Sequence, residues 1–481
     1  MAYKHGVYVS EMPTSIIPPV RTSAGLPVVF GTAPIHLASD PAPVNKPVLC
    51  YNYAEAVAAL GYSADWDKYT LCEVMYSQFA LYNRAPVVFV NVLDPATHKA
   101  AVAQAEKSIS NDKVVVADPV ILSTLVVKKT ANGDALVEGT DYVAAYNDKE
   151  QCVISVVDGG ALDGELSMFI NYDKVDASAV TANDIIGGID STTGKKKGLE
   201  ALNDVFPLYR LVPGIVLAPG WSHIPNVAAV MKAKAGNINE HFKAIILTDV
   251  PTATVKKYGD VAAWKETNSY TGNDQVVCWP MGRMGDSKYY LSTHILGVIS
   301  QTDSANDDIP FVSPSNKGIQ ITGTCLADDT EIVLGPNEAA LLNGNGIVTA
   351  LNFIGGWKSW GNRTGCYPGN TDPKDAFICI RRMFNWHAQT FILTYWQKVD
   401  DPMNKRLIQT VLDSENIRLN GLTARGALLG GRVEFQEDEN PLTDLIDGIV
   451  KFHTYLTPPV PAREIDNVIE FDPSYFSVLF G

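Results

Sequence analysis

Two kinds of hydrophobic pattern alternate along much of this chain, and their order predicts an α/β layer. Short apolar runs, typical of strands buried on both faces, alternate with segments in which apolar residues recur at helical spacing. The expected strands are residues 26–31, 86–92, 214–220, 244–249 and 276–280. The expected helices are residues 53–61, 70–82, 198–206 and 224–235. Strands separated by helices favour a parallel or mixed sheet covered on both faces.

Between residues 113 and 172 the pattern changes to alternation with period two. Turn signals, Asn132-Gly133-Asp134 and Asp158-Gly159-Gly160, fall between the apolar runs. We therefore predict a small all-β module, a β-sandwich or barrel, inserted into the α/β domain at residues 101–190.

The last fifth of the chain carries two amphipathic helical patterns. The apolar positions of the first are Leu407, Ile408, Val411 and Leu412, and those of the second are Leu442, Leu445, Ile446, Ile449 and Val450. Each pattern forms one apolar stripe, which has to be buried against something. An α+β domain is expected there.

Both ends of the chain are expected to be extended arms without a core of their own. Residues 6–11 are strand-like, and the prolines in residues 16–20 exclude a helix. After the proline-rich residues 458–461, residues 468–471 and 475–480 are apolar and extended, with no later sequence to pair with. Such strands need an edge, in their own subunit or in another one.

Composition narrows the class of protein. The length of 481 residues exceeds what one hydrophobic core usually supports, so several domains are expected. The net charge of -15 argues against binding a nucleic-acid backbone. Seven cysteines, scattered singly, suit reduced thiols in a cytoplasm. Residues 1–6 lack the apolar core of a signal peptide, and the apolar runs are too short for a bilayer, so a soluble protein made in the cytoplasm is expected.

Candidate catalytic residues are few. Asp249 and His294 could supply two members of a subtilisin-type triad, but no later serine lies in the tight turn that this triad requires. We therefore expect Asp249 to be a helix cap or turn residue.

Other motifs favour no cofactor and no metal. Residues 188–196 resemble a phosphate loop, but the spacing has one residue too many and Lys196 stands where Ser or Thr is needed, so a solvated basic linker is expected. The histidines show no metal-binding spacing, and Cys366 and Cys379 lack a second pair. We expect the tryptophans, for instance Trp357, Trp360 and Trp396, to pack in a core or interface rather than stack on carbohydrate.

A series of short stretches, weak singly but in a consistent order over almost the whole chain, carries a family resemblance. They are residues 6–11, 27–33, 198–202, 213–220, 300–303, 313–316, 351–364, 381–382 and 458–464. In this order they resemble the tail sheath protein of contractile bacteriophage tails. The inserted β module is the variable part of that family, and no detailed match is claimed there.

The resemblance implies a multidomain protein, α/β in its main domain and α+β overall. The expected parts are an N-terminal extended arm (residues 1–25), the first part of the α/β core (26–100), the inserted β-rich domain (101–190), a subtilisin-like α/β sheath domain (191–360), a C-terminal α+β sheath domain (361–460) and a C-terminal extended arm (461–481). The subtilisin-like name carries over as a fold only, because the setting of the catalytic serine is absent.

The resemblance also implies a structural subunit and not an enzyme. Such subunits form a sheath of six-fold rings around a tail tube, which contracts when the baseplate triggers it and drives the tube through the host envelope. The implied partners are neighbouring sheath subunits, the tail tube protein, and baseplate and tail terminator proteins, with no nucleic acid and no direct membrane insertion. The implied location is the virion tail, assembled in the host cytoplasm.

In this family the terminal arms join the sheet of a neighbouring subunit, which links the rings by main-chain hydrogen bonds. The residues expected to make these inter-subunit contacts are Val7, Tyr8, Val9, Ile16, Ile17, Val468, Ile469 and Phe471.

Three alternatives stay open. A phage-tail-like bacteriocin or related contractile injection system shares this subunit. A degenerate subtilisin-like hydrolase would need a nucleophile that the sequence does not reveal. A self-assembling surface-layer protein would also use terminal strands, but would normally carry an export signal.

Overall fold

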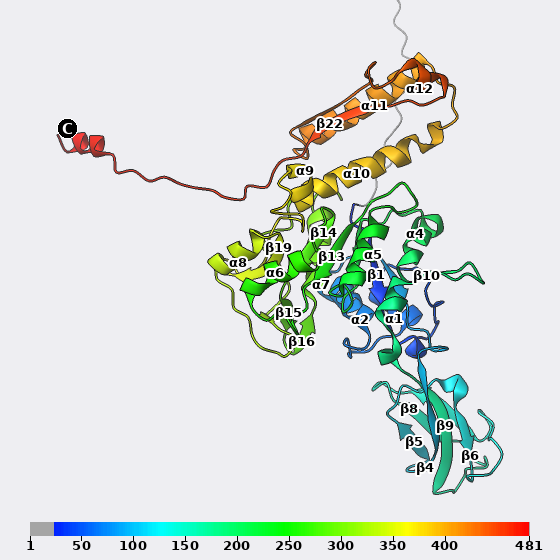
Figure 1. Ribbon diagram of the computed structural model, residues 1–481. Helices are drawn as coiled ribbons and strands as arrows, with labels where there is room; N and C mark the ends of the chain where they lie inside the picture. The colour runs from blue at the N-terminus through cyan, green and yellow to red at the C-terminus, as the bar shows by residue number, and fades with distance from the viewer. Residues whose placement is uncertain (1–23, 481) are drawn as a thin grey trace, which may run out of the picture.

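A large mixed sheet organises the protein, whose computed structural model describes residues 24–480 (Figure 1). Within these residues nine strands form that sheet, in the order β17-β20-β19-β14-β13-β12-β1-β3-β2. Their bounds are β1 (Pro27–Gly31), β2 (Val48–Cys50), β3 (Val87–Asn91), β12 (Ile215–Leu217), β13 (Ile245–Asp249), β14 (Gln275–Cys278), β17 (Lys317–Gly318), β19 (Ile347–Asn352) and β20 (Trp357–Trp360). The strands from β3 to β19 pair in parallel, and β2, β20 and β17 are antiparallel additions at the two edges. The predicted α/β layer is confirmed.

The central strands are apolar because both of their faces are covered. Val28 of β1 lies between Val216 of β12 and Val88 of β3, and all three side chains are fully buried. Helix α2 (Thr70–Met75) packs against β1, α5 (Pro225–Ala235) against β13, and α7 (Leu291–Ser304) against β12, β13 and β14. Continuous apolar strands are the sequence signature of such a doubly covered parallel sheet.

Shorter elements complete this α/β part. Its remaining helices are η1 (Ile35–Leu37), α1 (Tyr53–Leu60), α3 (Ala182–Ile186), η5 (Gly198–Ala201), α4 (Leu202–Tyr209), α6 (Tyr258–Thr267) and α8 (Pro336–Asn343). A small antiparallel sheet contains β15 (Met281–Met284), β16 (Ser287–Tyr289) and β18 (Gly323–Cys325).

Two expectations about local structure are corrected here. The helix predicted over residues 70–82 changes register after α2, because residues Tyr76–Leu81 (η2) form a π-helix. The predicted basic linker is a short hairpin of β10 (Gly188–Ile189) and β11 (Lys196–Lys197). Asp190 stabilises its turn by accepting hydrogen bonds from the backbone N–H groups of Thr192 and Thr193, at 3.1 and 2.8 Å. A side chain that satisfies backbone donors in this way favours a tight turn over an open linker.

The residues with alternating pattern form a β-rich module with a core of its own, at the lower end of Figure 1. One three-stranded sheet contains β4 (Lys99–Ser108), β9 (Ser167–Val175) and β6 (Val126–Lys128). The other contains β5 (Lys113–Val116), β8 (Cys152–Val156) and β7 (Tyr142–Tyr146), with η3 (Leu122–Thr124) between β5 and β6 in the chain. Their inward side chains, among them Val127, Ile154 and Met168, form a separate cluster.

The module joins the large sheet through two neighbouring chain segments. Lys99, at the start of β4, pairs with Val175, at the end of β9. After η4 (Ala177–Ala179) the chain returns to the main body, where Val180 and Ile185 belong to the core of the large sheet. The module is therefore attached at one end only.

The C-terminal region is α+β, as predicted. Its elements are α9 (Pro373–Ala376), α10 (Ile378–Tyr395), η6 (Trp396–Lys398), α11 (Lys405–Ala424), β21 (Gly430–Glu434), α12 (Leu442–Ile446) and β22 (His453–Thr457). Helix α11 begins where the Asn404 side chain accepts a hydrogen bond from the N–H of Leu407 (3.0 Å). Met383 and Trp386 of α10, Leu419 of α11 and Val433 of β21 share one buried cluster.

The second amphipathic pattern departs from the expectation. Helix α12 ends at Ile446, because the chain turns at Gly448, whose φ of 80° suits glycine. Leu442, Ile446 and Ile449 are 72%, 78% and 45% exposed, so the burial predicted for this stripe is wrong within residues 24–480.

Candidate functional site

The C-terminal arm leaves the body of the protein after β22 and touches little of it (Figure 1). Residues 461–472 have no regular secondary structure. Val468, Ile469 and Phe471, three residues expected at inter-subunit contacts, are 87%, 86% and 75% exposed. Apolar side chains as exposed as these mark a surface that has no partner within the described chain.

The end of the arm corrects a prediction. Residues expected to be extended form a 3-10 helix, η7 (Pro473–Phe480). Asp472 accepts a hydrogen bond from the N–H of Ser474 (2.9 Å), and the rings of Phe471 and Phe476 lie 5.9 Å apart. No strand lies beside this segment in the described chain. The backbone groups of residues 472–480 therefore form hydrogen bonds with nearby residues of the same segment, where a strand would use a neighbouring strand.

A two-stranded sheet lies close to the root of this arm. β21 and β22 pair in antiparallel fashion from Gly430 with Thr457 to Glu434 with His453, and within residues 24–480 neither strand has a third strand beside it. The peptide of Val433 is bonded instead by the side chain of Asn416 in α11, with both distances 3.0 Å. An isolated two-stranded sheet is marginal in water, so this one depends on α11 and still offers an edge for another strand.

The N-terminal candidates cannot be placed. Val7, Tyr8, Val9, Ile16 and Ile17 lie outside the residues that the structure describes.

The two candidate catalytic residues do not face each other. Asp249, at the end of β13, accepts hydrogen bonds from the backbone N–H and the hydroxyl of Ser292, at 3.0 and 2.5 Å. His294, two residues after Ser292 in α7, is bonded through Nδ1 to the hydroxyl of Tyr82 (2.9 Å). Asp249 is the last residue of β13 and the N-cap residue of α7 is Tyr290, so Asp249 is neither a turn residue nor the N-cap, but it satisfies a backbone N–H in the first turn of α7 from a neighbouring strand.

Burial shifts the pKa values of these two groups in opposite directions. Burial raises the pKa of Asp249 to about 6, against the opposing effect of the hydroxyls and N–H that bond it. Burial lowers the pKa of His294 to about 3. An imidazole whose pKa is lowered to about 3 is a weak base, and the Nδ1 of His294 bonds a tyrosine hydroxyl where a triad has a carboxylate, so His294 lacks the setting of a triad base.

The sequence analysis did not predict a buried ion pair that connects the C-terminal region to the α/β body. Arg382 of α10 makes a two-pronged ion pair with Asp303 of α7, in which Nη1 and Oδ1 lie 2.9 Å apart, and it also donates to the carbonyl of Ala24 (3.2 Å). Arg382 and Asp303 are both buried. The pair ties the C-terminal helix to the main body at the first described residues. The adjacent Arg381 and Arg382 were visible in the sequence, but Asp303 lies 79 positions away, so nothing indicated the pairing.

Neither a metal cluster nor a membrane helix is found in the described part of the chain. Residues 24–480 hold no group of three or more His, Cys, Asp or Glu side chains that could bind a metal ion. No helix among them is long and apolar enough to cross a bilayer. All seven cysteines are free and buried.

Comparison with known proteins decides between the classes that remain. The tail sheath protein of Burkholderia phage BcepMu is 27% identical over 500 residues, which cover 100% of this chain and 99% of that protein. The chain belongs to the tail sheath protein family. No family model matches the chain.

Solved sheath structures share the fold. A subunit of the sheath complex in the contracted state of the extracellular contractile injection system PVC aligns with a TM-score of 0.58 at 13% identity, over 99% of both chains. The sheath tail protein of Desulfitobacterium hafniense aligns with a TM-score of 0.55 at 12% identity, over 95% of this chain and 98% of that one. The sheath-like fold thus extends over nearly the whole chain. Tail sheath proteins are structural proteins and not enzymes, in keeping with the separate roles of Asp249 and His294.

Proposed function

We propose that this contractile tail sheath subunit polymerises as stacked six-fold rings around a tail tube and contracts to drive the tube through the host cell envelope. The observation that carries the proposal is the full-length likeness to a phage tail sheath protein, from the first residues to the last. The exposed C-terminal arm supports it, because an arm without a place in its own subunit is suited to a polymer.

Neighbouring subunits would be linked by strand exchange. Val468, Ile469 and Phe471 of the C-terminal arm, with Val7, Tyr8, Val9, Ile16 and Ile17 of the N-terminal arm, would add strands to sheets of adjacent copies. The outer edge of β22 is a suitable acceptor, whereas Asn416 already bonds the peptide of Val433 on the outer edge of β21. At a net ~0.5–1.5 kcal/mol per hydrogen bond, a few ladder bonds per subunit would hold neighbours together while the domains move.

The domain division predicted from the sequence is part of this proposal. A subtilisin-like sheath domain would combine residues 26–100 and 191–360, the insert at residues 101–190 would be a β-sandwich or barrel, and residues 361–460 would form the C-terminal sheath domain. The partners would be the tail tube, baseplate and tail terminator proteins, in a virion tail assembled in the host cytoplasm.

A second candidate is the sheath of a phage-tail-like bacteriocin or another contractile injection system. The likeness to the PVC sheath supports it at the level of fold alone. A degenerate hydrolase has less support, because Asp249 and His294 bond different partners.

Electron microscopy of the purified protein tests the proposal. The expected result is hollow, striated cylinders, alone or around a co-expressed tube protein. A protein that stays a monomer or a closed dimer at high concentration, with or without the tube, would contradict it.

A further inference from the structure

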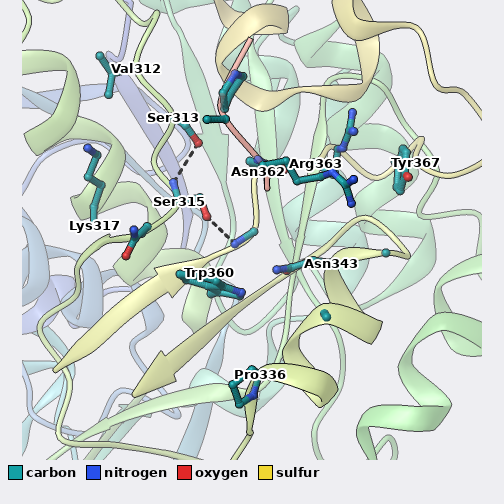
Figure 2. Close-up of a pocket in the computed structure, with 17 residues that line it drawn as sticks. Val312, Ser313, Ser315, Lys317, Pro336, Asn343, Trp360, Asn362, Arg363 and Tyr367 are labelled. Atoms are coloured by element: carbon teal, nitrogen blue, oxygen red, sulfur yellow. Dashed lines mark hydrogen bonds between the residues drawn. The ribbon is translucent and has the colours of Figure 1, made fainter. Parts of the chain in front are cut away.

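A hollow of about 500 Å³ lies at the root of the C-terminal arm (Figure 2). Its walls come from residues 312–317, from α8, from the end of β20 and the residues after it (360–367), and from residues 461–463, where the arm begins. Ser315 orders one wall, since its hydroxyl accepts a hydrogen bond from the N–H of Gly361 (3.0 Å). The hollow is therefore built from segments that are far apart in the sequence.

The charged side chains that line this hollow are all cationic. They are Lys317, Arg363 and Arg463, and no carboxylate lies among the lining residues. This is unusual in a protein whose net charge is -15. A concave surface with one sign of charge concentrates ligands of the opposite sign.

Arg363 has an unsatisfied group at this place. Its guanidinium lies over the rings of Phe377 and Tyr367, 3.7 and 4.4 Å from their centroids, which fixes its position. Its Nε is buried and has no hydrogen-bond partner in the described chain. Burial lowers the pKa of Arg363, and the positive charge of Arg463 lowers it further. Arg463 pairs with the adjacent Glu464 of its own copy, with Nη2 and Oε2 3.0 Å apart, but both side chains of this pair are largely exposed. The unpaired, buried Nε of Arg363 beside a second positive charge therefore still favours an incoming anion.

The first part of the C-terminal arm has the complementary charge. Residues 464–472 hold four carboxylates and no cation, and all nine side chains are exposed. In an extended strand alternate side chains share a face. One face would then carry Glu464, Asp466, Glu470 and Asp472, with Val468 between them, and the other Ile465, Asn467, Ile469 and Phe471.

We propose that the acidic face of one copy's C-terminal arm binds the cationic hollow, Lys317, Arg363 and Arg463, of a second copy. The inference rests on the proposed exchange of arms and adds an electrostatic contact to it. The arm of the same copy is a poor occupant, because its root forms one wall of the hollow and the chain then runs away from the body (Figure 1). Each copy carries a net negative charge, so two copies repel each other, and opposite charges at this contact offset that repulsion. The spacing of the charges also favours one register of the arm over others.

Charge reversal in the assembled sheath tests the contact. The hollow variant is K317E/R463E, whose two side chains are exposed, and the arm variant is E470K/D472K. Each is expected to raise the subunit concentration needed for sedimentable polymer about tenfold, because two attractions become repulsions. One chain that carries all four changes restores opposite charges and is expected to return to within about threefold of the unmodified protein. The variant K149E/K195E, with the same charge change on exposed lysines elsewhere, is the control and should assemble normally.

The outcomes separate this inference from the function on which it rests. If K317E/R463E assembles like the control while deletion of residues 464–481 prevents assembly, the arm is exchanged but does not use the hollow. If that deletion leaves assembly unchanged, arm exchange itself is wrong and the inference fails with it. Failure of the four-change chain to recover also overturns the pairing. Should charge reversal unfold the subunit, the neutral pair K317Q/R463Q replaces it, with a loss of about threefold expected and no loss counting against the contact.

Discussion

At the scale of single residues, Asp249 makes the stability of the core depend on pH. Its pKa of about 6 lies above the ordinary value of 3.8, so the folded protein binds a proton that the unfolded chain has released at intermediate pH. Stability therefore falls as pH rises from about 4 to about 6, and the loss is complete above that window. Two pKa units correspond to roughly 3 kcal/mol.

The variant Asp249→Asn should remove this dependence, since an amide can still accept from the N–H of Ser292 and does not titrate. We expect urea unfolding of the unmodified protein to lose up to roughly 3 kcal/mol relative to the variant between pH 4 and pH 6. The neighbouring Glu73 is fully buried too, and its pKa is raised well above 4.5 by burial, so E73Q in both backgrounds is the control. If the unfolding free energies of the unmodified protein and of D249N change with pH in the same way, the pH dependence does not come from Asp249.

The pair of Arg382 and Asp303 is a second residue-scale determinant. Arg382→Met leaves the Asp303 carboxylate buried without its partner, which should cost about 3–5 kcal/mol of unfolding free energy. The double variant R382M/D303L removes both charges and should recover part of this loss. The exposed pair of Arg425 and Asp307, 3.2 Å apart, is the matched control, and R425M should cost less than about 1 kcal/mol. Equal losses for the two arginines would show that burial of the pair is unimportant.

At the scale of elements, the sequence predicted best where one environment surrounds a whole segment. Strands β1, β12 and β13 were predictable because both faces are covered and every position is apolar. Helix α11 was predictable because its apolar side packs into one cluster with α10 and β21. Around α12 and η7 the same apolar pattern has no partner among residues 24–480, so periodicity indicated a buried or extended element that these residues do not form.

The candidate site divides in the same way. Val468, Ile469 and Phe471 could be picked out from the sequence, because apolar residues followed a proline-rich break near its end. The hollow could not, since Lys317, Arg363 and Arg463 are each ordinary surface-type residues until the fold brings them together. The alternation of acidic and apolar residues in the arm was the one available signal.

The strand character of the arm yields an element-scale prediction. Val468→Pro removes a backbone donor and restricts the preceding residue, which weakens a strand wherever that arm pairs. Because Val468 is 87% exposed in the subunit, thermal unfolding of the isolated protein should stay within about 1 °C of the unmodified value. Sheath assembly around the tube should be weakened or lost. Val468→Thr keeps the donor and the branched side chain, and is expected to assemble. A proline variant that builds normal, contracting sheaths would disprove the strand linkage.

At the scale of the whole molecule, the protein combines a large α/β body with parts that make few contacts with that body. Most of the sheet and its helices share one extensive core, with a second cluster where β14 and β19 meet α6 and α8, whereas the β-rich module has a separate core and the described C-terminal arm has none. Small, separately packed units attached at one place can move or be replaced with little cost to the body. This division suits a subunit whose neighbours must stay linked while their domains rearrange.

The attachment of the β-rich module allows the last prediction. Ala100 and Lys174 are paired neighbours in β4 and β9, so the chain can be closed between them by an Asn-Gly turn in place of residues 101–173. The deletion leaves Val180 and Ile185, which pack in the main core, untouched. We expect the shortened chain to be soluble and to unfold cooperatively, with a midpoint within a few degrees of that of the full chain. Removing residues 175–190 as well should instead cost several kcal/mol, because it takes Val175, Val180 and Ile185 out of that core. If both shortened chains are insoluble or lose cooperative unfolding to the same extent, the module is part of the folding unit of the large sheet, and its separate core does not make it independent.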